Sequence, residues 1–117
     1  MLLIRNEQME IMRCQRMSVM VTRATAHVRR FYPAKVVDLE PSQLELLLRD
    51  TLRVAYAYGF VTTSQALKFV NLSIELGVGF YRSAPYAVIL QATDHLTADE
   101  RVLHVRRCMA LNAEDAQ

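Results

Sequence analysis

The sequence predicts an all-α protein, an irregular bundle of about five helices with a long N-terminal helix and a central apolar third helix. The chain of 117 residues has only three glycines and three prolines, so long helices can form without interruption. Apolar residues recur at the i, i+4 and i+7 spacing of one helical face. Pairs of a hydroxyl residue with Glu or Gln three positions later, the spacing of a capping box, mark three helix starts.

The first helix is predicted over residues 4–32, a stretch without glycine or proline that ends before Pro33, because the residue before a proline disfavours the helical region. A helix of about 29 residues is about 43 Å long, whereas a domain of about 100 residues has a radius of gyration of about 13 Å. We therefore expect this helix to extend beyond the bundle at its N-terminal end. Its core-facing side is predicted to hold Met17, Val21, Ala24, Val28 and Phe31, widened on one side by Met9, Met12 and Met20.

The second helix is predicted over residues 41–58. Pro41 suits a first helical turn, and Ser42 and Glu45 have the spacing of a capping box. Gly59 can adopt the left-handed conformation that often follows a last turn, and it therefore marks the C-terminal end.

The third helix is predicted over residues 63–76. Thr62 and Gln65 form a second candidate capping box at its start. Its only charged residues are Lys68 and Glu75, so it is apolar on nearly all sides. A helix of this kind is typical of the middle of a bundle.

Two further helices complete the prediction. A short one is expected to begin around Ser83 and Pro85 and to reach about Ala92, although an irregular apolar segment remains the alternative there. The last helix is predicted to begin at the capping pair Thr97 and Glu100 and to end near residue 112.

Composition predicts one folded domain over residues 1–117. Hydrophobic residues make up 52% of the chain and charged residues 22%, which is typical of a globular protein and not of a disordered one. No internal repeat, low-complexity tract or polar linker divides the sequence.

The cysteines and the apolar runs predict a cytoplasmic protein without a membrane partner. Cys14 and Cys108 lack the spacing of a zinc site or a disulfide framework, so we interpret them as free thiols in a reducing compartment. Glu7 and Glu10 interrupt the N-terminal run that a secretory signal would need. The longest later run, YAVIL at 86–90, is too short to span a bilayer.

No pattern in the sequence indicates an enzyme, a cofactor or a metal. Nucleophiles usually lie on strained, glycine-containing turns, and none of the serines, threonines or cysteines has that context. His27, His95 and His104 do not form the HExxH pattern that places two imidazoles on one helical face. The three glycines follow predicted helices and do not precede them as a phosphate cradle would.

Charge is distributed unevenly along the chain. Residues 1–37 hold seven basic and two acidic residues, whereas residues 38–117 hold seven basic and ten acidic ones. Four arginines fall within one sector of the first helix: Arg13, Arg16, Arg23 and Arg30. The acidic remainder and the lack of stacking aromatics argue against nucleic acid, so the sector is either a solvated face or a contact for an acidic partner.

Five of the six methionines lie within the first 20 residues, interleaved with arginines. Methionine is flexible and polarizable, so a methionine-rich surface can adapt to a partner protein, although such residues also fill irregular cores. We predict a protein-binding surface for another protein or a second copy, formed by Leu3, Met9, Met12, Arg13, Arg16, Met20 and Arg23.

Four segments resemble a group of small helical bacterial proteins encoded beside type VI secretion effectors: LLIRNEQM at 2–9, HVRRFYP at 27–33, AYAYGF at 55–60 and FVNLSIELGVGF at 69–80. Asn71 stands where the group usually has an acidic residue, and Gly77-Val78-Gly79 replaces a more acidic ending. The resemblance implies an accessory role, as an adaptor or co-chaperone that binds an effector or another component of its loading complex. The alternative is an immunity protein that neutralises a toxin by direct binding.

Overall fold

The computed structural model describes the backbone of residues 2–77 and 79–115 and the side chains of residues 15–77 and 79–111. Within these residues the protein is all-helical, without strands, and the predicted all-α class is confirmed. Six α-helices and one 3-10 turn are found where five helices were predicted: α1 (Leu2–Phe31), α2 (Pro33–Val36), α3 (Pro41–Ala57), α4 (Thr63–Leu76), η1 (Phe80–Arg82), α5 (Tyr86–Gln91) and α6 (Ala98–Asp115).

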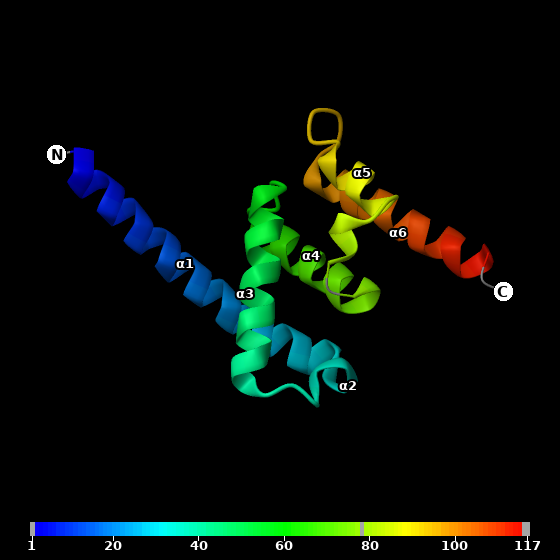
Figure 1. The fold of residues 1–117 in the computed structure, drawn as a ribbon, viewed down its shortest axis with the longest axis horizontal. Helices are drawn as coiled ribbons and strands as arrows, with labels where there is room; N and C mark the ends of the chain where they lie inside the picture. Colours follow the sequence, from blue (N-terminus) through cyan, green and yellow to red (C-terminus); the bar gives the residue numbers. More distant parts are fainter. Residues whose placement is uncertain (1, 78, 116–117) are drawn as a thin grey trace.

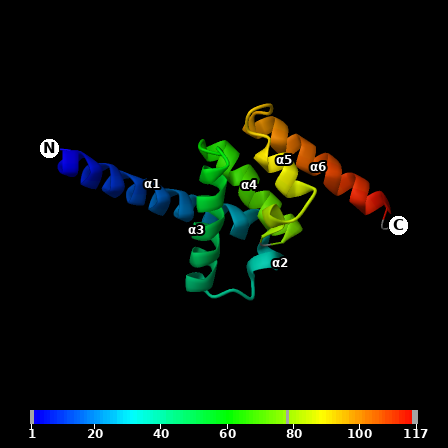
Figure 2. The same ribbon diagram turned by 45° about the horizontal axis from the view of Figure 1, so that its top comes forward.

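Helix α1 is continuous and extends beyond the rest of the protein, as predicted from its length. Its C-terminal half crosses α3, and its N-terminal half projects away from the other helices in both views (Figures 1 and 2). The radius of gyration is 15.7 Å, larger than the value of about 13 Å typical of a domain of about 100 residues.

The core-facing side of α1 is predicted correctly except at its end. Val21, Ala24 and Val28 are buried and Met17 is partly buried against them. Phe31, predicted to face the core, is 59% exposed and its ring contacts the ring of His27. The prediction was wrong here because α2 packs against this end of α1 and its Val36 side chain joins the core instead. The side chains of Met9 and Met12 lie outside the described residues.

Helix α2 is the α-helix that was not predicted from the sequence. Pro33 was interpreted only as a stop signal, but the chain leaves the helical conformation for one residue, Tyr32, and Pro33 then begins a new helical turn. Proline favours this position because its fixed φ suits a first turn, where no N–H donor is needed.

The start of α3 corrects the predicted cap. Pro41 occupies the first helical position, so the capping residue is Glu40, whose backbone N–H donates to the Gln43 side chain at 3.0 Å. The predicted box of Ser42 and Glu45 is therefore wrong, and Glu45 instead pairs with Arg49 one turn later.

Helix α4 begins and packs as predicted. The Gln65 backbone N–H donates to the Thr62 hydroxyl at 3.1 Å, and the Gln65 side chain accepts from the Thr62 backbone N–H, so the capping box is confirmed. Ala66 and Val70 lie in a first core cluster with α1, α2 and α3. Phe69 and Leu72 lie in a second cluster with η1, α5 and α6. This helix therefore joins the two clusters, which confirms its central position.

The C-terminal elements close the second cluster. The α5 helix is shorter than predicted, and α6 begins with the predicted pair, in which Thr97 and Glu100 each bond the backbone of the other. This hydrogen bonding, chiefly from the Thr97 backbone N–H, lowers the pKa of the Glu100 carboxyl. Arg101 is 3% exposed, donates to the Leu90 carbonyl at 2.9 Å and covers the Phe60 ring at 4.8 Å. No helix among the described residues is long and apolar enough to cross a membrane.

Candidate functional site

The seven residues of the predicted binding surface all belong to α1, but the structure places only three of their side chains. Arg16 and Arg23 are exposed, whereas Met20 is 8% exposed and belongs to the first core cluster. The other four side chains lie outside the described residues: Leu3, Met9, Met12 and Arg13.

The three placed residues meet in a groove between α1 and the junction of α3 and α4. The groove has a volume of about 410 Å³. We call it the arginine groove, and its lining residues are Gln15, Arg16, Val19, Met20, Arg23, Tyr56, Val61 and Thr63. Its lining residues come from α1, the C-terminal end of α3 and the start of α4. Figure 1 shows that the N-terminal half of α1 diverges from α3.

Apolar side chains from two elements lie at the mouth of the arginine groove. Val19, on α1, is 54% exposed, and Val61, between α3 and α4, is 67% exposed. Val19 lies three residues after Arg16 and four before Arg23, so helical spacing places it on the same side of α1 as both arginines. Exposed apolar residues on both walls are typical of a contact for another apolar surface.

The polar groups of the arginine groove carry positive charge without a compensating carboxylate. Its lining contains no acidic residue, and neither Arg16 nor Arg23 makes an ion pair or hydrogen bond with a described residue. Thr63 is the first residue of α4, whose N-terminal end adds a partial positive charge. Burial raises the pKa of Tyr56. Its hydroxyl, like that of any tyrosine at neutral pH, can donate a hydrogen bond. The groove therefore favours an anionic partner.

Sequence reasoning missed the residues on the far wall. Tyr56, Val61 and Thr63 come from the junction of α3 and α4, and only the crossing of α1 over α3 brings them beside Arg16 and Arg23. The one local signal was an apolar residue, Val61, two residues after Gly59, where a solvated turn usually has a polar residue.

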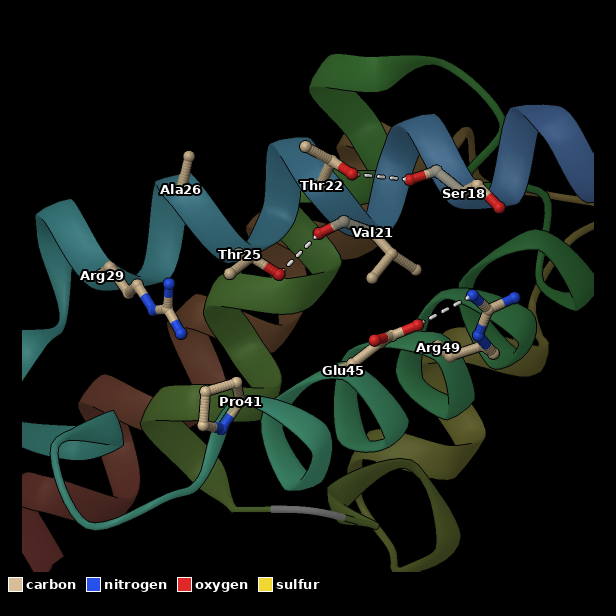
Figure 3. Close-up of a pocket in the computed structure, with 9 residues that line it drawn as sticks. All are labelled: Ser18, Val21, Thr22, Thr25, Ala26, Arg29, Pro41, Glu45 and Arg49. Atoms are coloured by element: carbon tan, nitrogen blue, oxygen red, sulfur yellow. Dashed lines mark hydrogen bonds and ion pairs between the residues drawn. The ribbon is translucent and has the colours of Figure 1, made fainter.

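A second groove lies on the other flank of α1, where it passes the N-terminal half of α3 (Figure 3). We call it the threonine groove, with a volume of about 500 Å³, and its lining residues are Ser18, Val21, Thr22, Thr25, Ala26, Arg29, Pro41, Glu45 and Arg49.

The polar groups of the threonine groove are largely satisfied within the chain. The Thr22 and Thr25 hydroxyls donate to the carbonyls of Ser18 and Val21 one turn earlier, at 3.0 and 2.7 Å. Glu45 and Arg49 pair at 3.2 Å, and both line the groove. This groove is therefore closer to electrical neutrality than the arginine groove, with Arg29 as its unpaired cation among the described residues.

The remaining polar contacts hold helices together. His27 Nε2 and Asn71 Oδ1 lie 2.7 Å apart, which ties α1 to α4. The Tyr32 hydroxyl donates to one oxygen of Glu75, and Arg106 donates to the other, so α4 is tied to α6 as well. Hydrogen bonding to Glu75 adds to burial in raising the pKa of Tyr32. These residues are used for packing, so the arginine groove is the strongest candidate site within the part of the chain that the structure describes.

The described residues contain no group of three His, Cys, Asp or Glu side chains that could hold a metal ion. Cys108 is a half-buried free thiol, and the side chain of Cys14 lies outside the described part of the chain. Comparison of the sequence with protein-family models and curated proteins, and of the structure with solved structures, found no match.

Proposed function

We propose that the protein is a non-enzymatic interaction module that binds another protein through α1. The observation that carries this proposal is the combination of a projecting helix with the arginine groove, which lies beside the middle of that helix. Arg16 and Arg23 there have no partner among the described residues, and apolar side chains lie between and opposite them. Interfaces typically combine an apolar centre with arginines that orient the partner.

The class of partner follows from the resemblance of four sequence segments to small proteins encoded beside type VI secretion effectors. On this basis the partner is a secretion effector or a component of its loading complex. The protein then acts in the cytoplasm as an adaptor or co-chaperone, without nucleic acid, membrane or cofactor.

Affinity purification from the native cell, followed by mass spectrometry, tests this proposal. The wild-type chain and a variant lacking residues 1–12 are compared, with circular dichroism to confirm that the variant is folded. We expect the wild type to recover an effector or a loading component, and the variant to lose it. Equal recovery by both proteins and by a variant with Arg16→Glu and Arg23→Glu, with a monomer in light scattering, would remove the proposal.

A growth assay separates the adaptor role from an immunity role. If the recovered partner is a toxin, an adaptor leaves its toxicity unchanged and deletion of the adaptor gene abolishes export. An immunity protein instead restores growth when it is produced together with the toxin. Restored growth would replace the adaptor proposal with the immunity interpretation.

A further inference from the structure

We propose that the arginine groove binds an amphipathic α-helix of the partner that carries two carboxylates two helical turns apart. This inference rests on the proposed function and adds to it the chemistry of the segment that is bound. It is carried by the spacing of two arginines, the apolar side chains between and opposite them, and the charge of the groove.

The spacing of the arginines sets the spacing of the carboxylates. Arg16 and Arg23 are seven residues apart on a continuous helix, which corresponds to about 10.5 Å along its axis. A partner helix lying along α1 presents residues i and i+7 at the same separation. Guanidinium groups bind carboxylates in planar, bidentate pairs, so arginines at this spacing select acidic residues two turns apart.

The apolar lining of the groove determines which residue types we expect between the two carboxylates of the partner helix. Val19 lies between the two arginines on one wall and Val61 lies on the other. Residues i+3 and i+4 of a helix share a face with residues i and i+7, so they enter the groove when the carboxylates reach the arginines. Large aliphatic residues at these positions would cover both valines, which are more than half exposed.

The arginine groove fits this helix better than the threonine groove does. Glu45 lines the threonine groove and already pairs with Arg49, so an acidic helix there would meet a carboxylate. No acidic residue is found among the described residues that line the arginine groove. A nucleic acid is a poorer occupant, because the exposed Val19 and Val61 are apolar and the half-buried Tyr56 is the single aromatic residue among the described residues of the lining.

Synthetic peptides test the inference with the full-length protein. The acidic probe is a labelled helical peptide of about 18 residues, long enough to form a helix, with Glu at i and i+7 and Leu at i+3 and i+4. The basic probe has Lys in place of both Glu residues. We expect fluorescence polarization to show the acidic probe binding at least about tenfold more tightly, because like charges across an interface are strongly unfavourable.

Charge reversal locates the binding in the arginine groove. The double variant Arg16→Glu/Arg23→Glu should reverse the preference, so that the basic probe binds more tightly than the acidic probe. Arg29→Glu is the matched control, because it makes the same kind of change on the same helix but in the threonine groove. It should keep the wild-type preference. Val61→Asp should weaken binding of the acidic probe, and thermal melts confirm that each variant is folded.

Several results would overturn the inference. These are failure of the acidic probe to bind at millimolar concentration, equal binding of both probes, or a preference that the double variant leaves unchanged. Tighter binding of a DNA duplex, lost steeply with salt and abolished by the same double variant, would assign the groove to nucleic acid instead. If the double variant still recovers the native partner while deletion of residues 1–12 abolishes recovery, this inference fails and the proposed function stands.

Discussion

Helices α1 and α4 use their surfaces in different ways. Helix α4 packs on α1, α3 and α6, and its apolar residues are shared between the two core clusters. Helix α1 packs through its C-terminal half, and its N-terminal half projects from the protein (Figure 1). The difference indicates that α4 holds the fold together, whereas the exposed flanks of α1 are free for recognition. Truncation of the buried apolar side chains of α4 should therefore lower stability, and changes of the exposed arginines on α1 should alter binding alone.

The largest loss of stability is expected from Phe69→Ala. This α4 side chain is fully buried, and its ring lies 5.2 Å from Phe60 and 5.4 Å from Phe80, measured between ring centroids. Removal of the ring leaves a cavity, so the free energy of unfolding should fall by about 3 to 5 kcal/mol. Urea denaturation measures this change, and Val61→Ala, at an exposed position, serves as the control. A loss below about 1 kcal/mol for Phe69→Ala would contradict the central role of α4.

The next largest loss is expected from Arg101→Ala. Arg101 closes the second cluster by bonding the Leu90 carbonyl and covering Phe60, and burial lowers its pKa. Without it, the buried carbonyl loses its charged donor, and stability should fall by about 2 to 3 kcal/mol. Arg107→Ala, at an exposed position of the same helix, should change stability by less than about 0.5 kcal/mol. Equal effects of the two substitutions would show that Arg101 does not hold this cluster together.

A gain in stability is expected from Ser73→Ala. The buried Ser73 hydroxyl on α4 has no hydrogen-bond partner among the described residues, and it lines a small cavity against α3. Removal of an unsatisfied polar group should raise the free energy of unfolding by about 1 kcal/mol. Ser64→Ala, at an exposed site of α4, controls for helix propensity. Thermal melts that show no gain beyond this control would mean that the hydroxyl is satisfied in solution.

The smallest effect on stability is expected on α1 itself. Arg16→Ala and Arg23→Ala remove exposed side chains that have no partner among the described residues. Each should change the free energy of unfolding by less than about 0.5 kcal/mol, because surface substitutions away from specific contacts are nearly neutral. A loss above 1 kcal/mol in either variant would show that these arginines serve the fold, and the division between α1 and α4 would not hold.

The sequence predicted most of the fold because helix ends depend on local chemistry. Thr62 with Gln65 and Thr97 with Glu100 mark starts that the structure confirms, and Gly59 ends α3 with a φ of +88°. The predictions failed where tertiary contacts determine whether a side chain is buried or exposed. Phe31 has the spacing of a core residue, but it lies at the end of α1, where no other helix buries its side chain, and it is exposed. No local pattern predicted that Arg101 would be buried.

The candidate site was predicted on one wall only. Arg16, Met20 and Arg23 line the same groove. Met20, however, is largely buried and does not protrude from the surface as a binding residue was expected to. The other wall, with Tyr56 and Val61, depends on the angle at which α1 crosses α3. Side-chain periodicity predicts which face of a helix is buried, but it contains no information about this crossing angle.

Site-specific photo-crosslinking in the native cell tests the central claim most directly. Ser18 and Val19 are adjacent and exposed, but Val19 lines the arginine groove and Ser18 lines the threonine groove. A photoreactive amino acid at position 19 should form a covalent adduct with a partner protein, and the same group at position 18 should form far less. Equal adducts from both positions, or none from position 19, would contradict the claim that this flank of α1 binds a partner.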